Sequence, residues 1–431
     1  MITKQLIDKI EGEASIYFDM EDDIVKSSTI SFPHFRGMEK ILEGKNALDA
    51  LVITPRVCGI CGHAHLMATV NALEDAYKNA GHEVKLSQKA QTIRELTLVL
   101  EMIQNHFKWI YLVIIPELST FSSKSEQTQL KAAYAASLVS KAIATLAGQW
   151  PHSSYMVPGG VTCDPTQIDI LQVKNYIDEV IAFLEKETIG IRLETFLNFS
   201  SCKEFDDIKS DVATIENVLI ENDFHKSGFA YDRFLVFGEH SFSQVSKLIK
   251  TRALSVDVKF ATVEQAYSPN EKTFALNAVY KGDFYETGPL ARTMSTNLLI
   301  VKNMHRRYKD SAYTRVMARI FELGSLLEHT KKLTSSIDIT QESFIKPRNI
   351  NEITAEGVGV VEAPRGPLIH KVVLEKGKII KYEIITPTQW NIGSSTPKKP
   401  SPAQKAMKGL SKEKAQFVFR TFDVCSVCTT H

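Results

Sequence analysis

The sequence predicts a mainly α fold of the α+β class: a large central helical bundle with small β-hairpin or β-sheet insertions. Long segments have apolar residues at every third or fourth position, which is the helical period. Strand patterns are confined to short patches. The 431 residues suit two or three domains or one large one. Because we find no internal repeat and no long linker, we expect one domain over residues 1–431.

Four long helices are expected. Apolar residues recur at helical spacing over 86–106. Segment 125–148 is rich in strong helix formers and stops at a glycine, which is typical of a helix C-terminus. A third helix is expected after Pro165 and a fourth over 313–333.

Strand character is clearest over 371–385, which predicts a hairpin turning at Gly377. Segment 393–402 is rich in proline, serine and lysine, so we expect an exposed loop there. The longest apolar run, 109–115, is far shorter than the roughly 20 residues of a membrane helix. No signal peptide is recognisable, so we expect no direct membrane insertion.

The composition excludes several classes of protein. Apolar residues make up 44 %, enough to exclude global disorder. Lys and Arg number 51 and Asp and Glu 50, a net charge of +1. This balance gives no electrostatic footprint for nucleic acid or an anionic membrane surface.

The six cysteines are too few for a disulfide scaffold, but four of them form two close pairs. Cys58 and Cys61 lie near one end of the chain and Cys425 and Cys428 at the other. The two-residue spacing lets both sulfurs of a pair reach one metal ion. Thiolates favour zinc, iron, copper(I) or nickel over magnesium. A metal site assembled from both chain ends is expected, and a structural four-thiolate zinc site remains an alternative.

The amino-terminal pair lies in RVCGICGHAH (56–65), which resembles the RxCGxCxxxH motif of the large, catalytic subunit of [NiFe] hydrogenases. The carboxy-terminal pair lies in FDVCSVCTTH (422–431), which resembles their DPCxxCxxH. Further similar motifs follow in the family's order: KIEGE (9–13), FRGME (35–39), GQWPHSSYMVPGGV (148–161), GPLAR (288–292), EAPRGPL (362–368) and TPTQWN (386–391).

The resemblance implies the large-subunit fold and reversible heterolytic cleavage of H2 to protons and electrons. Four thiolates would hold nickel, with Cys58 and Cys425 as terminal ligands. Cys61 and Cys428 would bridge to an iron that carries one carbonyl and two cyanide ligands.

The resemblance also assigns acid–base and positioning roles. Cys425 would accept the proton from H2 and Glu11 would pass it outward. Arg365 would lie over the open metal position and donate to a cyanide. Asn105 stands where the family often has a carboxylate that pairs with this arginine. We therefore expect Arg365 to depend on Asp423 alone.

Other implied positions surround the metals. Thr388 would bond the second cyanide, and Pro364 and Leu368 would form an apolar wall. His65 would donate a hydrogen bond to a bridging sulfur.

A magnesium or similar divalent ion is implied by Glu39, the carbonyl of Ile384 and His431. In the family, a maturation protease cleaves the precursor just after this histidine once nickel-insertion factors have acted. Both kinds of factor are therefore expected as partners.

Electrons must leave such a centre, and each iron–sulfur cluster needs about four cysteines. Only Cys163 and Cys202 remain, and we expect both to be small buried hydrophobes. Fe-S clusters are therefore expected only in a small partner subunit. The chain is expected in the cytoplasm, or at a membrane through that subunit or another partner.

A hydrogen-sensing regulatory subunit with the same site is the main alternative to a catalytic subunit. Related respiratory-complex subunits share the fold but lack the four cysteines, so their presence here argues against a non-catalytic relative.

Overall fold

The computed structural model describes residues 2–7, 12–122, 129–237, 247–249, 256–296, 298–392, 399–423, 425–427 and 430. Three predicted site residues, Glu11, Cys428 and His431, lie outside the described residues.

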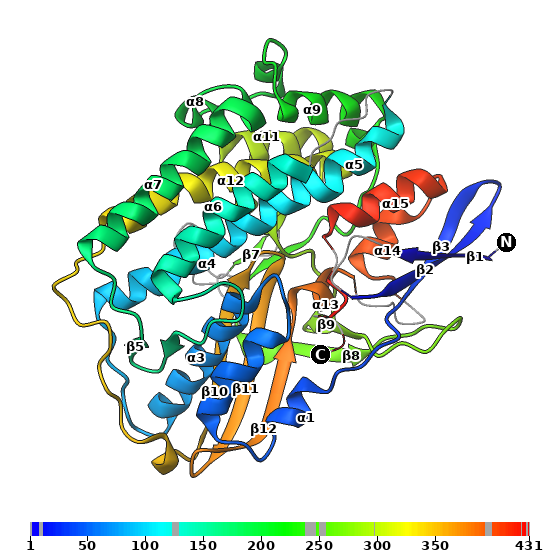
Figure 1. Cartoon of the computed structure of the whole chain (residues 1–431). Coiled ribbons are helices and arrows are strands. Elements are labelled where there is room, and N and C mark those ends of the chain that lie inside the picture. The colour runs from blue at the N-terminus through cyan, green and yellow to red at the C-terminus, as the bar shows by residue number, and fades with distance from the viewer. Residues whose placement is uncertain are drawn as a thin grey trace.

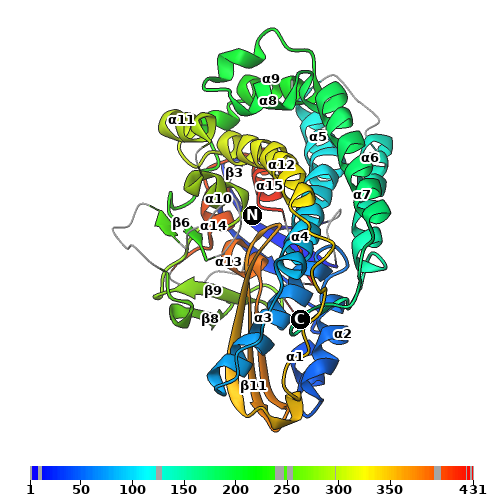
Figure 2. The ribbon, with the colours of Figure 1, turned by 90° about the vertical axis from the view of Figure 1, so that its left-hand side faces the viewer.

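Four long helices form the central bundle and lie side by side (Figures 1 and 2). They are α4 (Gln88–Trp109), α6 (Gln129–Ala147), α7 (Gln167–Phe183) and α12 (Ala312–Ser335). The four predicted helices are thus confirmed, with ends that shift by a few residues. Gly148 follows α6 with φ +77°, as expected of a glycine that ends a helix.

The helix α4 continues beyond its predicted end. A π-helical turn over Ile110–Ile114 leads into α5 (Ile115–Leu118), so the helical run covers Gln88–Phe121. This run is the one in the described chain that is long and apolar enough to cross a membrane, but 78 % of its apolar window is buried inside the protein. That burial is typical of the core helix of a bundle.

A three-stranded antiparallel sheet lies below the bundle in Figure 1. Its order is β10 (Ala355–Ala363), β11 (Gly366–Glu375), β12 (Lys378–Ile385). The predicted hairpin is β11–β12, and it turns at Lys376 and Gly377 with φ of 49° and 72°. Positive φ at both positions is what the two-residue turn of a right-twisted hairpin requires.

The helix α3 (Gly62–Asn79) packs on β10 at unusually close range. A Cβ atom at Gly359 would lie 2.0 Å from the carbonyl oxygen of Ala68, and one at Gly357 would lie 2.1 Å from that of Ala72. The glycines let the helix backbone rest directly on the strand. As the residue number rises along β10 it falls along α3, so the start of α3 lies beside the end of β10.

A second three-stranded sheet contains β1 (Ile2–Ile7), β2 (Ala14–Glu21) and β3 (Ile24–Ser31). The helices α14 (Pro402–Met407) and α15 (Lys412–Thr421) lie beside it, so an amino-terminal sheet and two carboxy-terminal helices pack together (Figure 1).

The expected exposed loop over 393–402 is wrong at its end. Ser401 is fully buried, and its side chain accepts a hydrogen bond from the amide of Gln404 in the first turn of α14. A capping serine thus begins a buried helix where composition favoured a loop. Residues 393–398 lie outside the described part.

The remaining helices are short: α1 (Met38–Leu42), α2 (Ala50–Ile53), α8 (Leu193–Leu197), α9 (Asp211–Glu221), α10 (Pro289–Ser295), α11 (Leu299–Tyr308) and α13 (Pro387–Asn391). The remaining strands form pairs: β4 (Met156–Val157) with β5 (Gly160–Val161), β6 (Phe234–Val236) with β7 (Lys247–Ile249), and β8 (Ala261–Gln265) with β9 (Leu276–Tyr280).

Candidate metal centre

Cysteines from both chain ends meet in the interior. Cys58, Cys61 and Cys425 are buried and form a small cluster, against which Ile60 and Val427 pack. The Sγ atoms of Cys58 and Cys425 are 3.6 Å apart. A disulfide bond would need a separation of about 2.05 Å. Two thiolates that bind the same metal ion, each at about 2.3 Å, have the separation seen here. Two of the four predicted thiol ligands are thus placed to share an ion.

The helices α3 and α4 hold the amino-terminal cysteine loop. Glu101, fully buried on α4, accepts hydrogen bonds from the amides of His63 (2.8 Å) and Ala64 (3.0 Å) in the first turn of α3. Burial raises the pKa of Glu101 to about 8, although these two amides oppose the shift. Sequence reasoning missed this residue, because a glutamate within an apolar helix carries no motif of its own.

Arg365 lies in the two-residue turn between β10 and β11, close to the cysteines because α3 begins beside the end of β10. Its Nη2 donates to Oδ1 of Asp423 at 3.2 Å and its Nε donates to the backbone carbonyl of Asp423 at 3.0 Å. Nε also lies 3.0 Å from Oδ2, so the two side chains form an ion pair. Burial disfavours the charge of Arg365, but Asp423 and the thiols of Cys425, Cys61 and Cys58 outweigh it and raise its pKa.

The expectation that Arg365 depends on Asp423 alone is wrong. Nη1 of Arg365 also donates to Oδ1 of Asn105 at 3.2 Å. An amide oxygen accepts from a guanidinium as a carboxylate does, although it brings no charge.

The GPLAR segment holds the Arg365 turn in place. Arg292, in α10, donates to the carbonyls of Ala363 and Pro364, both at 2.9 Å. A Cβ atom at Gly288 would lie 2.7 Å from the carbonyl oxygen of Arg365, so only glycine permits this approach. The motif was recognised in the sequence, but its contact with the turn required the fold.

Three further predicted residues are buried near this turn. Pro364 lies in the turn and Leu368 in β11. Thr388 lies in α13, and its Oγ1 has no hydrogen-bond partner among the residues that the structure describes. A buried hydroxyl costs free energy unless it is bonded, so Thr388 fits a site that receives a further hydrogen-bond acceptor.

His65 is held by a second buried histidine. Its Nδ1 is 3.1 Å from Nε2 of His370. Nδ1 of His370 is 2.8 Å from the hydroxyl of Tyr382 and 3.1 Å from that of Thr69. This network fixes the ring of His65, as an orienting residue requires. His370 lies two positions after the EAPRGPL motif. This closeness to a recognised motif could have pointed to it in the sequence.

The predicted magnesium ligands Glu39 and Ile384 are neighbours. The amide of Ile384 donates to Oε1 of Glu39 at 2.8 Å. The amide of Arg36 donates to the carbonyl of Thr430 at 3.1 Å, which brings the end of the chain to the start of α1.

Residues next to Glu11 approach the carboxy-terminal cysteine loop. A Cβ atom at Gly12 would lie 2.9 Å from Oγ of Ser426, and that hydroxyl donates to the carbonyl of Glu13 at 2.6 Å. Within the described residues, no three His, Cys, Asp or Glu side chains converge as a complete metal site. Each of the two predicted sets of metal ligands includes one residue that the structure does not describe, Cys428 in the thiolate set and His431 in the magnesium set.

Cys163 and Cys202 are only partly buried, although both were expected to be buried. Both side chains pack against the core, and burial raises the pKa of each thiol.

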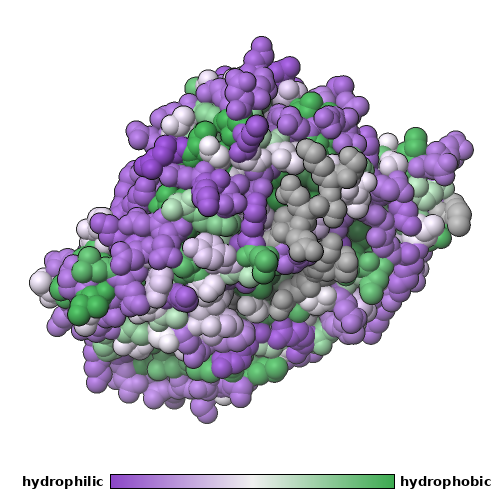
Figure 3. Space-filling view, turned by 45° about the horizontal axis from the view of Figure 1, so that its top comes forward, coloured by the Kyte–Doolittle hydropathy of each residue, from purple (hydrophilic) through white to green (hydrophobic). Residues whose placement is uncertain are grey.

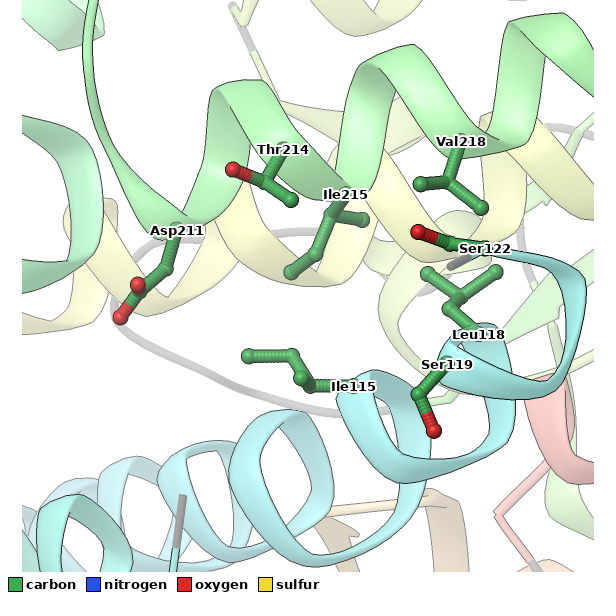
Figure 4. A pocket seen from close by; sticks show the side chains of 8 residues that line it. All are labelled: Ile115, Leu118, Ser119, Ser122, Asp211, Thr214, Ile215 and Val218. Carbon is green, nitrogen blue, oxygen red and sulfur yellow. The ribbon is translucent and has the colours of Figure 1, made fainter. Parts of the chain in front are cut away.

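Away from the cysteines, the described residues form a largely polar face and a small cavity between α5 and α9. Figure 3 shows a mostly hydrophilic face on which apolar residues are scattered in small groups. A cavity of about 30 Å³ lies between α5 and α9 (Figure 4). Its one charged residue, Asp211, already accepts from the hydroxyl of Tyr111 and from Lys131, both at 2.8 Å.

This mainly helical chain brings buried thiols from its two ends together near a buried arginine, which is the donor chemistry of a thiolate-ligated metal site. The model of the nickel-dependent hydrogenase family matches residues 36–115 and 127–431. The chain belongs to this family.

Relatives match along most or all of the chain. Sulfhydrogenase 1 subunit alpha of Pyrococcus furiosus is 25 % identical, over 100 % of this chain and 97 % of its own. The periplasmic [NiFeSe] hydrogenase large subunit of Desulfomicrobium baculatum is 25 % identical, over 89 % of this chain and 84 % of its own. A solved structure of the Dm. baculatum [NiFeSe] hydrogenase has a TM-score of 0.83 at 22 % identity and covers 100 % of both chains. These findings confirm the predicted fold and family.

Proposed function

We propose that this protein is the catalytic large subunit of a hydrogenase that cleaves H2 reversibly into protons and electrons. The observation that carries the proposal is the 3.6 Å separation between the sulfurs of Cys58 and Cys425, from opposite ends of a chain of the nickel-dependent hydrogenase family. The same meeting of the ends supports one domain over residues 1–431.

The buried thiols fit a nickel–iron centre. Cys58, Cys61, Cys425 and Cys428 would hold nickel, and Cys61 and Cys428 would also bind iron. Bound there, the centre supplies a soft, redox-active Lewis acid with a position for H2. Carbonyl and cyanide ligands on the iron are part of the proposal, and the buried Oγ1 of Thr388 and the guanidinium of Arg365 would be their hydrogen-bond donors.

The residues around the thiols would handle the proton. The thiolate of Cys425 would accept it, and Glu11 would carry it outward as a general base. The contact between Gly12 and Ser426 supports this role, because Glu11 precedes Gly12 and Ser426 follows Cys425.

A magnesium or similar ion would bind Glu39, the carbonyl of Ile384 and His431. The 2.8 Å hydrogen bond between Glu39 and the amide of Ile384 supports this site, because it holds the carboxylate against the strand. Carboxylate and carbonyl oxygens are the ligands that magnesium prefers.

Electrons would pass to a small subunit with Fe-S clusters, because two half-buried cysteines cannot hold a cluster. Relatives named as large subunits support such a partner. A maturation protease and nickel-insertion factors would complete the site. We propose the cytoplasm as the compartment; one relative is named periplasmic, so cell fractionation is the test.

The test is H2-dependent reduction of a viologen dye by the protein purified with its small subunit. We expect activity in the wild-type complex, a loss of at least a hundredfold in Cys58→Ser, and no change in the control Cys163→Ser. Full activity in Cys58→Ser would contradict the proposal. Slow turnover at full nickel occupancy, with a signalling protein as the bound partner, would favour the hydrogen-sensing alternative.

A further inference from the structure

A chain of buried charged side chains leads from Arg365 into the helical bundle. Its first link is Asp423, whose Oδ1 and backbone carbonyl accept from Nη2 and Nε of Arg365. The second is Arg319 on α12, whose Nη1 lies 2.6 Å from Oδ2 of Asp423. The guanidinium of Arg319 lies 4.4 Å from the ring centre of Trp109, which fixes its plane. One carboxylate thus serves two arginines, and the position of one arginine constrains the other.

The third link is His106 on α4. Nε of Arg319 donates to Nδ1 of His106 at 3.0 Å. A guanidinium only donates, so Nδ1 carries no proton and the ring proton lies on Nε2. Nε2 is 2.7 Å from Oε2 of Glu322 and donates to it. Burial, and then the charge of Arg319, lower the pKa of His106 to about 4, which agrees with a neutral ring. The tautomer of His106 is therefore locked from both sides.

The chain returns to the Arg365 turn. Glu322 also accepts from Nε and Nη2 of Arg292, at 2.7 and 2.8 Å. Burial disfavours the charge of Glu322, but Arg292 outweighs it and the pKa of Glu322 is lowered. Arg292 donates to the carbonyl of Pro364, the residue before Arg365. The side chain and the backbone of the Arg365 turn are thus held by the same buried network.

The network is balanced in charge. The three arginines at positions 292, 319 and 365 face three carboxylates, Glu322, Glu362 and Asp423. Such a buried network is weak as a source of stability, because desolvation offsets the attraction between the charges. The network therefore contributes mainly by fixing the positions of these side chains.

We propose that His106 and Arg319 are positioning residues for the hydrogenase reaction. The locked histidine aims Arg319 at one oxygen of Asp423, and Asp423 then holds Arg365 in the direction it needs over the thiols. This inference rests on the proposed function, in which Arg365 donates to a cyanide ligand.

The test compares His106→Leu with His106→Gln. Leucine fills the site but neither accepts from Arg319 nor donates to Glu322. The amide of glutamine can do both. The matched control is His329→Leu, which breaks another contact between the same two helices: Nε2 of His329 lies 3.0 Å from Oε1 of Glu95.

The readouts are the cyanide infrared bands and kcat of the loaded two-subunit complex, with the position of Arg365 in crystal structures. In His106→Leu we expect shifted bands, a displaced guanidinium and a kcat lowered at least about tenfold, with the KM for the acceptor dye unchanged. His106→Gln restores all three, and His329→Leu changes none. A folded His106→Leu protein with wild-type bands and Arg365 position would overturn the proposal.

The experiment still decides if the His106→Leu variant does not fold or if the proposed ligand set is wrong. If His106→Leu does not fold, Arg319→Lys decides, because it keeps the charge but loses the Nε donor to His106; the same shifts are expected, and wild-type bands would overturn the inference. If the wild-type complex shows no cyanide bands, the proposed ligand set fails. The position of Arg365 in the crystal structures then still tests the positioning roles.

Discussion

Asn105 links Arg365 to the cysteine loop. Its Oδ1 accepts from Nη1 of Arg365 at 3.2 Å, and its Nδ2 donates to the carbonyl of Ile60 at 2.6 Å. The guanidinium can only donate and the carbonyl can only accept, so the orientation of the amide is fixed. A carboxylate at this position could make the first bond but not the second. The amide thus couples the arginine to the backbone between Cys58 and Cys61.

Replacing this amide by a carboxylate is the first test. In Asn105→Asp we expect the contact with Arg365 to persist and the Ile60 carbonyl to lose its donor. An unsatisfied buried carbonyl costs about 1–3 kcal/mol, so the variant should unfold at a lower temperature and turn over more slowly. Thermal unfolding and the viologen assay measure both effects. An unchanged melting temperature would show that the Ile60 contact contributes nothing.

The variant Arg292→Lys tests whether the hydrogen bonds from Arg292 hold the Arg365 turn in place. Lysine keeps the charge but cannot reach two carboxylates and two carbonyls together. We expect a loss of about 2 kcal/mol or more and a kcat lowered at least tenfold. Arg94→Lys is the control, because Arg94 makes a similar buried pair with Glu74 but does not touch this turn. It should lose stability and keep kcat. Equal losses of kcat in both variants would argue against this role of Arg292.

The contact between α3 and β10 is tested by Gly359→Ala. The added Cβ would lie 2.0 Å from the carbonyl oxygen of Ala68, so the helix must move away from the strand and carry Cys61 with it. We expect a lower nickel content and a lower melting temperature. Gly324→Ala is the control: its Cβ would meet only side chains of Leu193, Leu197 and Phe196, at 3.2 Å or more. Normal nickel loading in Gly359→Ala would contradict this account of the packing.

The pH dependence of stability tests the environment of Glu101. Its pKa is about 8 in the folded protein against 4.5 for an exposed glutamate. The folded state therefore binds this proton more tightly than the unfolded chain. This contribution is complete below a pH of about 4.5 and is lost as the pH rises to about 8, by at most ~1.4 kcal/mol per pH unit.

Glu101→Gln removes the titration. Relative to this variant, the metal-free wild-type protein should lose stability between about pH 5 and pH 8, as measured by thermal unfolding. Parallel curves for the two proteins would show that Glu101 has an ordinary pKa.

The sequence was sufficient to predict the elements with a strong local signal. Periodicity predicted the four long helices, and Gly377 marked the turn of the β11–β12 hairpin. The strand β10 was missed, because its glycines weaken a strand pattern and only the backbone of α3 explains them. Ser401 reads as a loop residue until the helix that it caps is seen.

The residues of the site also fall into those that the sequence predicts and those that only the fold shows. Motifs predicted the cysteines, Arg365 and Asp423, because these residues lie in short, distinctive segments. Glu101, His106 and Arg319 lie within long helices, where periodicity gives no indication of chemistry. Their roles depend on contacts between helices that are distant in sequence, such as the one between α4 and α12.

Metal analysis together with infrared spectroscopy of the purified two-subunit complex tests the central claim most directly. We expect one nickel and one iron for each large subunit in addition to the Fe-S iron of the small subunit, with carbonyl and cyanide stretching bands, and the loss of that nickel and that iron in Cys425→Ser. Zinc in place of nickel, with no such bands, would contradict the proposed centre and would favour a structural four-thiolate site.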